Sequence, residues 1–154
     1  MGIADIGLAQ QLELMAVIAW AMALGGLVGW ERQLVAKPAG LRTHMLVAGA
    51  AALLSWVTAD LSLLASNGDP TRGIHAIITG IGFIGGGTIL RQRDEMPSGL
   101  TTAATVMYTA VLGSAVAVGY GISATAATVL AILVLRVFGW TRRDGADEPA
   151  EEPA

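Results

Sequence analysis

Long apolar segments alternate with short polar ones along most of the chain. Five segments are nearly free of charge and come close to the length of a bilayer-spanning helix, which needs about 20 apolar residues, with a range of roughly 17–25. They cover approximately residues 12–29, 45–65, 74–90, 100–119 and 122–137. Two of the connections, residues 67–70 and 119–121, have the Gly, Asn, Asp and Pro content of turns. The pattern predicts an all-α polytopic membrane protein with five transmembrane helices.

The same pattern divides the chain into three parts. Residues 1–11 form a short segment before the first helix, residues 12–140 hold the five-helix transmembrane domain, and residues 141–154 form an acidic, proline-containing tail. The composition of the tail predicts disorder. The first eleven residues contain no Lys or Arg, and a cleaved signal peptide begins with basic residues. We therefore expect the first helix to be retained in the membrane.

Composition supports the membrane assignment. Hydrophobic residues make up 54% of the 154 residues, charged residues 14%, and the mean hydropathy is +0.63, whereas soluble domains carry about 25% charged residues. The absence of cysteine excludes disulfides, zinc–thiolate sites and thiol catalysis. Five acidic residues after Arg143 account for the net charge of −3, and the rest of the chain is mildly basic. No basic patch for nucleic acid is visible.

The basic residues predict an orientation. With five spans, the first loop, the third loop and the C-terminal end lie on the same side of the membrane. That side holds eight of the nine Lys and Arg residues: Arg32, Lys37, Arg42, Arg91, Arg93, Arg136, Arg142 and Arg143. The positive-inside rule makes it cytoplasmic. The N-terminus is then outside, the C-terminus is cytoplasmic, and Arg72 is the one base on the outer side.

Residues 29–44 concentrate ionisable side chains between two apolar runs. The predicted topology gathers a cytoplasmic-side cluster of Glu31, Arg32, Lys37, Arg42, Thr43, His44, Arg91, Thr101 and Thr102. The N-termini of two helices point toward this side, and helix N-termini favour anions. One hypothesis is that Glu31 pairs with Arg42 and ties the first helix to the second. The alternative is that Glu31 and Arg32 are solvated and Arg42 extends to the lipid headgroups.

Glycines form a second pattern. Gly25 and Gly29 in the first predicted helix, and Gly82 and Gly86 in the third, are GxxxG pairs, which allow close helix packing in membranes. The third helix also contains Gly80, Gly85 and Gly87. Close packing of the first helix on the third, or of two protomers, is the simpler interpretation and predicts a homo-oligomer, most simply a dimer. The alternative is a helix broken at residues 85–87, as in transporters.

Several activities lack the residues they need. Magnesium sites use oxygen ligands, often carboxylates, and no Asp or Glu lies near the centre of a predicted span. Threonines could line a path, although membrane threonines more often bond to helix backbones. The only lysine, Lys37, lies in no phosphate-binding loop. No nucleophile–base–acid set is present. We therefore expect no enzyme activity, no cofactor and no resident metal site.

Four motifs together resemble the MgtC/SapB family of bacterial membrane proteins. They are GLVGWERQ at 26–33, KPAGLRTH at 37–44, GIGFIGGGTILR at 80–91 and GLTTAAT at 99–105. The resemblance implies a bacterial inner-membrane protein of about five spans with a regulatory role: growth under Mg²⁺ limitation, survival of pathogens in macrophages, and effects on the F-type ATP synthase and the membrane potential. Longer members carry a soluble C-terminal domain, so this chain resembles a short form with the transmembrane domain only.

Two functional hypotheses follow. In the first, the protein regulates Mg²⁺ homeostasis and membrane energetics through helix–helix contacts with itself or with another membrane protein, such as a P-type ATPase or the ATP synthase. In the second, it is a small transporter or channel for Mg²⁺ or another small solute, with a cytoplasmic-side site. The glycines of the third helix and the historical family name favour the second hypothesis. The missing intramembrane carboxylates favour the first.

Overall fold

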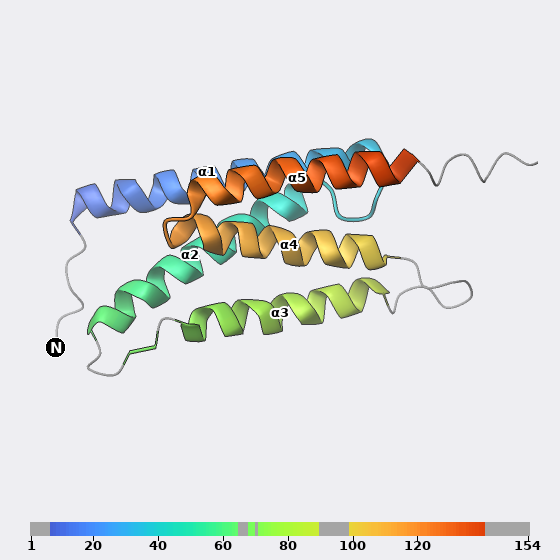
Figure 1. Cartoon of the computed structure of the whole chain (residues 1–154). Coiled ribbons are helices and arrows are strands. Elements are labelled where there is room, and N and C mark those ends of the chain that lie inside the picture. Colours follow the sequence, from blue (N-terminus) through green and yellow to red (C-terminus); the bar gives the residue numbers. More distant parts are fainter. Residues whose placement is uncertain (1–6, 65–67, 70, 90–98, 141–154) are drawn as a thin grey trace, which may run out of the picture.

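A computed structural model describes residues 7–64, 68–69, 71–89 and 99–140 of the chain, without the side chains of residues 64 and 138–140. These residues form five helices: α1 (Leu8–Leu34), α2 (Leu41–Leu64), α3 (Thr71–Ile89), α4 (Leu100–Ala117) and α5 (Gly121–Trp140). The helices are labelled in Figure 1. The prediction of an all-α protein with five helices is confirmed.

The helices extend beyond most of the apolar segments that predicted them. α1 begins before residue 12 and continues past Gly29 to Leu34, so Glu31 and Arg32 are helical residues rather than loop residues. Its 27 residues correspond to about 40 Å at 1.5 Å per residue. α1 is therefore longer than the roughly 30 Å hydrocarbon core of a bilayer, and its charged last turns can lie at the membrane surface.

Three helices are long and apolar enough to cross a membrane by themselves: α1, α2 and α4. The apolar part of α5, Gly121–Val137, is shorter. α3 does not belong to this set, because it holds Arg72 and His75 in its first turns and low-hydropathy glycines in its second half. The structure supports a multi-pass membrane protein, while five crossings and their direction stay predictions.

The helices run up and down in chain order, and α4 lies at the centre (Figure 1). α4 contacts each of the other four helices, and α2 also contacts α1 and α3. α5 packs on α1 and α4. The α1–α2 connection, the end of α3, the start of α4 and the end of α5 lie at one end of the bundle (Figure 1). We call this end the basic end, because Arg32, Lys37 and Arg42 belong to it.

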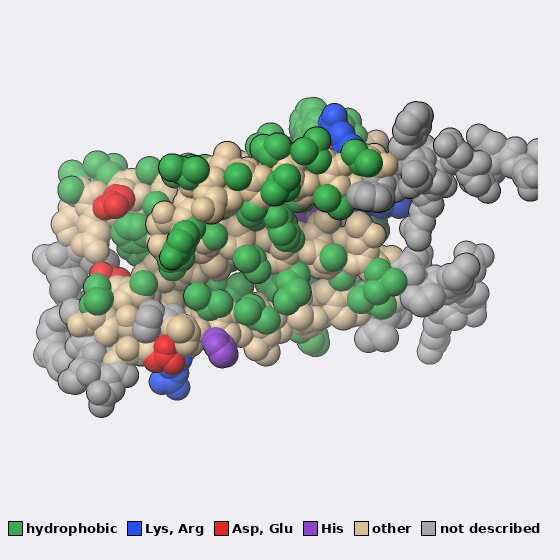
Figure 2. Space-filling model, in the orientation of Figure 1, with side chains coloured by type: hydrophobic (Ala, Val, Ile, Leu, Met, Phe, Trp, Pro, Cys, Tyr) green, Lys and Arg blue, Asp and Glu red, His purple; other side chains and the backbone are tan. Residues whose placement is uncertain are grey.

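Small residues fill the interior, and large apolar residues cover the outside. The main buried core contains Ala21, Ala48, Ala52 and Ala124 together with a few larger side chains. Phe83, Leu63 and Ile122 are 84–85% exposed. Figure 2 shows hydrophobic side chains along the whole visible face, with the visible Lys, Arg, Asp and Glu toward the two ends. Such an extensive apolar surface is unusual for a soluble monomer and suits contact with lipid.

Close backbone contact holds α2 against α4. Gly113 of α4 lies directly against the backbone of Ala48, including its carbonyl oxygen, so that any Cβ at this position would overlap it. Small residues allow this approach in membrane proteins, where dispersion forces and hydrogen bonds rather than water exclusion hold helices together.

A Schellman motif ends α4 and confirms the predicted turn at residues 119–121. Gly119 has φ +92°, the left-handed conformation that glycine adopts without penalty. The amide of Tyr120 donates to the carbonyl of Ala115 at 2.8 Å, and the amide of Gly119 donates to that of Val116 at 3.2 Å. These are the two bonds of the motif. α5 then starts at Gly121 and returns along α4.

Asp69 caps the start of α3 at the opposite end of the bundle. Its Oδ1 accepts hydrogen bonds from the backbone amide of Thr71 at 2.9 Å and from the Thr71 hydroxyl at 2.7 Å. The two bonds stabilise the carboxylate form and lower the pKa of Asp69, with smaller effects from the nearby charges of Arg72 and His75. An Asp before Pro at a helix start is a known capping signal, so this residue could have been found from the sequence.

Candidate functional site

The last turns of α1 bury two charged side chains against the rest of the bundle. Glu31 is 4% exposed and Arg32 is 5% exposed. The Nε of Arg32 donates to Oε2 of Glu31, and the two form an ion pair. Full burial of charged residues is rare unless they are paired. This pair therefore marks the basic end of α1 as an unusual place within the bundle.

The predicted Glu31–Arg42 pair was wrong, because Glu31 pairs with Arg32 instead. Arg42 lies in the first turn of α2, two residues before the buried His44, and is exposed. Residues two apart on a helix do not share a face. Since His44 faces α1, Arg42 points away from it.

His44 is fully buried and uses one ring nitrogen. Its Nδ1 lies 2.9 Å from the carbonyl oxygen of Gly40, and a carbonyl can only accept, so the hydrogen is on Nδ1. In the neutral ring, Nε2 then carries a lone pair and no hydrogen. Nε2 has no hydrogen-bond partner in the described part of the chain. A buried polar atom without a partner is uncommon, so this nitrogen is a candidate site for chemistry.

The α1 glycines make the room for His44. A Cβ on Gly25 would lie 2.5 Å from the carbonyl oxygen of His44 and 2.8 Å from the Cβ of Ala48. A Cβ on Gly29 would lie 2.8 Å from the carbonyl oxygen of Gly40 and 2.9 Å from the Cβ of His44. The predicted packing of the first helix on the third is thus corrected, because this glycine pair packs on α2 and α1 makes no contact with α3 in the described residues.

Gln33, which the sequence reasoning missed, closes the α1–α2 connection. Its Oε1 accepts from the backbone amide of Leu41 at 3.3 Å, one of the amides that a helix start leaves without an internal partner. The amide of Lys37 donates to the carbonyl of Arg32 at 3.0 Å, and Ala39 is buried. The connection is therefore built onto the end of α1. No sequence signal distinguished Gln33 from an ordinary surface residue.

The threonines at the start of α4 divide between the interior and the surface. Thr102, Thr105 and Thr109 are buried, whereas Thr101 is exposed. The hydroxyl of Thr105 donates to the carbonyl of Thr102 at 2.9 Å, and that of Thr109 donates to the carbonyl of Thr105 at 2.8 Å. These two hydroxyls bond to their own helix, which was the simpler of the two expectations.

The predicted cytoplasmic-side cluster is thus split by burial. Glu31, Arg32, His44 and Thr102 are buried, and we call Glu31, Arg32 and His44 the buried charged cluster. Lys37, Arg42, Thr43 and Thr101 are exposed. Arg91 lies outside the described residues. Among the described residues, no three His, Asp or Glu side chains come together as a metal site.

The glycines of α3 have a different environment from those of α1. α3 is one continuous helix from Thr71 to Ile89, so the alternative of a helix broken at residues 85–87 was wrong. A Cβ on Gly85 would touch Ala103 of α4 at 3.5 Å. A Cβ on any of the other four would meet nothing within 4 Å. The four are Gly80, Gly82, Gly86 and Gly87.

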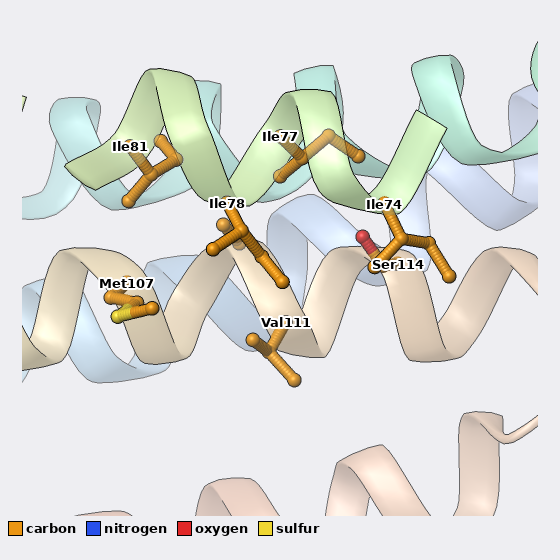
Figure 3. A pocket seen from close by; sticks show the side chains of 8 residues that line it. Ile74, Ile77, Ile78, Ile81, Met107, Val111 and Ser114 are labelled. Atoms are coloured by element: carbon orange, nitrogen blue, oxygen red, sulfur yellow. The ribbon is translucent and has the colours of Figure 1, made fainter. Parts of the chain in front are cut away.

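An apolar groove lies between α3 and α4 (Figure 3). Figure 3 shows Ile74 beside Ser114 at one end and Ile81 beside Met107 at the other, as expected for antiparallel helices. Ser114 is its only polar lining residue; the others are Ile74, Ile77, Ile78, Ile81, Met107, Ala110 and Val111. The groove offers no charge or metal ligand, so it can hold only an apolar group.

Comparison with known proteins gives one family and several relatives. A sequence profile of the MgtC family matches residues 18–143. YhiD of Escherichia coli K12, named as a candidate magnesium transporter, is 42% identical over 118 residues, which are 73% of this chain and 54% of that protein. MgtC of Brucella abortus strain 2308 is 41% identical over 119 residues, 77% of this chain and 48% of that protein.

SapB of Bacillus subtilis is 33% identical over 138 residues, which are 86% of this chain and 60% of that protein. The chain spans about half the length of the curated relatives that it matches. No solved structure matches the chain. The matched region contains α2 to α5 and the part of α1 from residue 18 onward, and thus both the buried charged cluster and the α3 glycines.

Proposed function

Since the chain belongs to the MgtC family, we propose that it is a non-enzymatic regulator of magnesium homeostasis in the bacterial inner membrane. It acts through contacts of its helices with a second copy or with another membrane protein, such as a P-type ATPase or the ATP synthase. Its basic end faces the cytoplasm, in keeping with the positive-inside rule. The E. coli relative is named for magnesium, which supports the choice of ion.

The observation that carries the proposal is the uncovered glycine face of α3. Each glycine in a soluble helix interior costs about 1 kcal/mol against alanine. At four of the five α3 glycines, an added Cβ would contact nothing in the described part of the chain, so no neighbour there requires a glycine. Phe83, between them, is 85% exposed. The reason for these glycines therefore lies outside the described residues, and glycine faces let a second helix approach closely.

Cysteine crosslinking tests this contact directly, because the native chain has no cysteine. With Phe83→Cys, we expect oxidation in native membranes to give a covalent dimer. Leu130→Cys is the matched control, because Leu130 is an exposed mid-helix residue of α5, and we expect it to stay monomeric. Equal crosslinking at the two sites would mean random collision and would contradict a dimer through α3.

A second pair of variants tests whether the dimer depends on close packing at the α3 glycines. Adding Gly82→Leu and Gly86→Leu to Phe83→Cys fills the glycine face, and we expect the dimer yield to fall at least about tenfold, the equivalent of 1.4 kcal/mol. Ala126→Leu places the same side chain on an exposed position of α5 and should leave the yield unchanged. If the chain pairs with another protein instead, oxidation of Phe83→Cys gives a mixed disulfide only where that protein presents a cysteine beside residue 83, and the two leucines abolish this adduct.

Transport remains the second candidate function, and the buried charged cluster favours it, since ionisable groups inside membrane proteins often mark solute paths. Purified protein in liposomes distinguishes the two. We expect no saturable Mg²⁺ flux above that of empty liposomes. Saturable flux that is lost in Glu31→Gln, but kept in the exposed-site variant Glu13→Gln, would overturn the regulatory proposal and support a transporter.

A further inference from the structure

The helices end at two different heights at the end of the bundle opposite the basic end, which we call the far end. We propose that the membrane surface follows this difference. On the α1–α2 side it lies at the tips of these helices, and on the side of α3, α4 and α5 it lies roughly 10–15 Å lower, at the α4–α5 turn. Phospholipid headgroups and water then occupy the space above the turn. The proposal holds or fails independently of the dimer through α3.

The packing of α1 and α4 on α2 fixes the difference in height. Gly25 of α1 and Gly113 of α4 lie at a common height, because an added Cβ at either one would overlap Ala48 of α2. From this height toward the far end, α4 continues only to Ala117, about 6 Å at 1.5 Å per residue, whereas α1 continues to Leu8, about 25 Å. Figure 1 shows α1 and α2 projecting beyond the α4–α5 turn.

α3 and α5 share the lower height of α4. Ile74, near the start of α3, lies beside Ser114 of α4 (Figure 3). α5 begins at Gly121, where an added Cβ would lie 2.5 Å from the ring of Trp20. The α4–α5 turn therefore lies beside Trp20, and the part of α1 above it is about 18 Å long.

Polar and aromatic side chains surround the lower height. Tyr120 in the α4–α5 turn is 64% exposed, and Trp20 is 44% exposed. Arg72 and His75, in the first turns of α3, are exposed as well. Trp and Tyr are enriched at membrane–water interfaces, and an arginine in contact with hydrocarbon is costly. On this side, the membrane surface therefore belongs at the α4–α5 turn.

Above the turn, α1 has an apolar face and a polar face. Leu8, Leu12 and Met15 are four and three residues apart, so they share one face, and they are 56–73% exposed. Glu13 is exposed and lies seven residues, or about two turns, before Trp20, so it stands over the α4–α5 turn. The first face suits hydrocarbon, and the second suits water and headgroups.

The tips of α1 and α2 carry their own polar pair. Nε2 of Gln10 donates to Oδ1 of Asp60 at 3.3 Å. Gln10 lies about 15 Å above Trp20 along α1. The apolar face of α1 continues up to this pair, so on the α1–α2 side the membrane surface belongs at the height of Gln10 and Asp60.

A flat membrane fits neither height. A surface at the Gln10–Asp60 pair on all sides would place Arg72 and the irregular backbone of the α4–α5 turn in hydrocarbon, where lipid-exposed irregular backbone does not occur. A surface at the turn on all sides would place Leu12 in water, which is unfavourable for an apolar side chain. Local thinning of the bilayer on one side resolves the conflict, and it is a known response to short apolar helices.

Spin labels at single cysteines measure these depths, because the native chain has no cysteine. The full chain is reconstituted in phosphatidylcholine liposomes, and each nitroxide is exposed to oxygen, which concentrates in hydrocarbon, and to a water-soluble nickel chelate. Ala19→Cys and Tyr120→Cys place labels at nearly the same height on different sides, since Ala19 is exposed and lies four residues after Met15 on the apolar face. We expect nickel access at least about fivefold higher at Tyr120→Cys, because polar solutes partition poorly into hydrocarbon.

A second pair compares two faces of the same helix turn. We expect the label at Met15→Cys to report hydrocarbon and the label at Glu13→Cys to report water or headgroups. Leu130→Cys, on the exposed side of α5 below the turn, supplies the hydrocarbon reference for the lower side. None of these sites lies on α3, so the result does not depend on the proposed dimer.

Equal depths for Ala19→Cys and Tyr120→Cys would mean a flat membrane and would overturn the proposal, whether both labels report hydrocarbon or both report water. Labels at Glu13→Cys and Tyr120→Cys that neither oxygen nor nickel reaches would mean that protein, rather than lipid and water, covers the space above the turn. That outcome would overturn it too.

Discussion

Glycine residues in this bundle have opposite roles that depend on what lies next to them. A Cβ at Gly25 would lie 2.5 Å from the His44 carbonyl oxygen, whereas one at Gly80 would meet nothing within 4 Å. We expect Gly25→Ala to destabilise the protein by about 1–3 kcal/mol, the usual range for overpacking. Gly80→Ala should stabilise it by roughly 0.5–1 kcal/mol through helix propensity. Unfolding in mixed micelles measures both, and equal effects would contradict the packing of α1 on α2.

Asp69 gives a second prediction for a single residue. The bonds to Thr71 lower the pKa of Asp69 from the ordinary 3.8. The stability that Asp69 gives to the start of α3 is therefore complete above pH 3.8. It is lost as the pH falls through the lower pKa of the folded state. We expect the first amides of α3 to exchange with solvent faster as the pH falls below about 4, after correction for intrinsic rates. Asp69→Asn, which still caps, should remove this pH dependence, and Asp69→Ala should expose the amides at every pH.

At the level of elements, the α4–α5 turn depends on backbone conformation rather than on space. Gly119 has φ +92° but no neighbour within 4 Å of an added Cβ. We expect Gly119→Ala to cost about 1–2 kcal/mol, the penalty of the left-handed region for an L-residue. Gly80→Ala should carry no such penalty, because the backbone at Gly80 is helical. Comparing unfolding free energies in one micelle separates conformational strain from steric overlap.

For the whole molecule, the prediction concerns direction in the membrane. Lys37 belongs to the basic end, and the exposed Tyr120 lies in the turn at the other end. A membrane-impermeant maleimide should label Tyr120→Cys in intact spheroplasts and Lys37→Cys only in inverted vesicles. The reverse labelling pattern would mean the opposite membrane topology and would contradict the orientation assigned from the basic residues.

The number and order of the helices were predictable because each depends on a local property. Apolar runs and turn residues suffice to place five helices, and residues 119–121 were recognised because the turn composition is itself the cause of the motif. The ends of α1 were not predictable in this way. Glu31 and Arg32 look like loop residues by polarity, and only the packing of neighbouring helices makes their burial possible.

The site could be predicted less well, because it depends on the rotation of helices about their axes. Glu31 had two arginines within reach, and the orientation of α2 decided between them by turning Arg42 outward. The GxxxG pairs of α1 and α3 have the same spacing, yet one contacts α2 and the other contacts nothing in the described chain. The unpartnered Nε2 of His44 has no counterpart in the sequence.

The glycine contacts on two sides of α2 have a mechanical consequence. Gly25 and Gly29 of α1 and Gly113 of α4 each touch α2 where even a methyl group would overlap. Sliding or rotating α2 by a fraction of a turn would bring bulkier neighbours onto these positions. α1, α2 and α4 therefore behave as one rigid body, and large relative motion is left to α3 and α5, each of which packs on only two members of it.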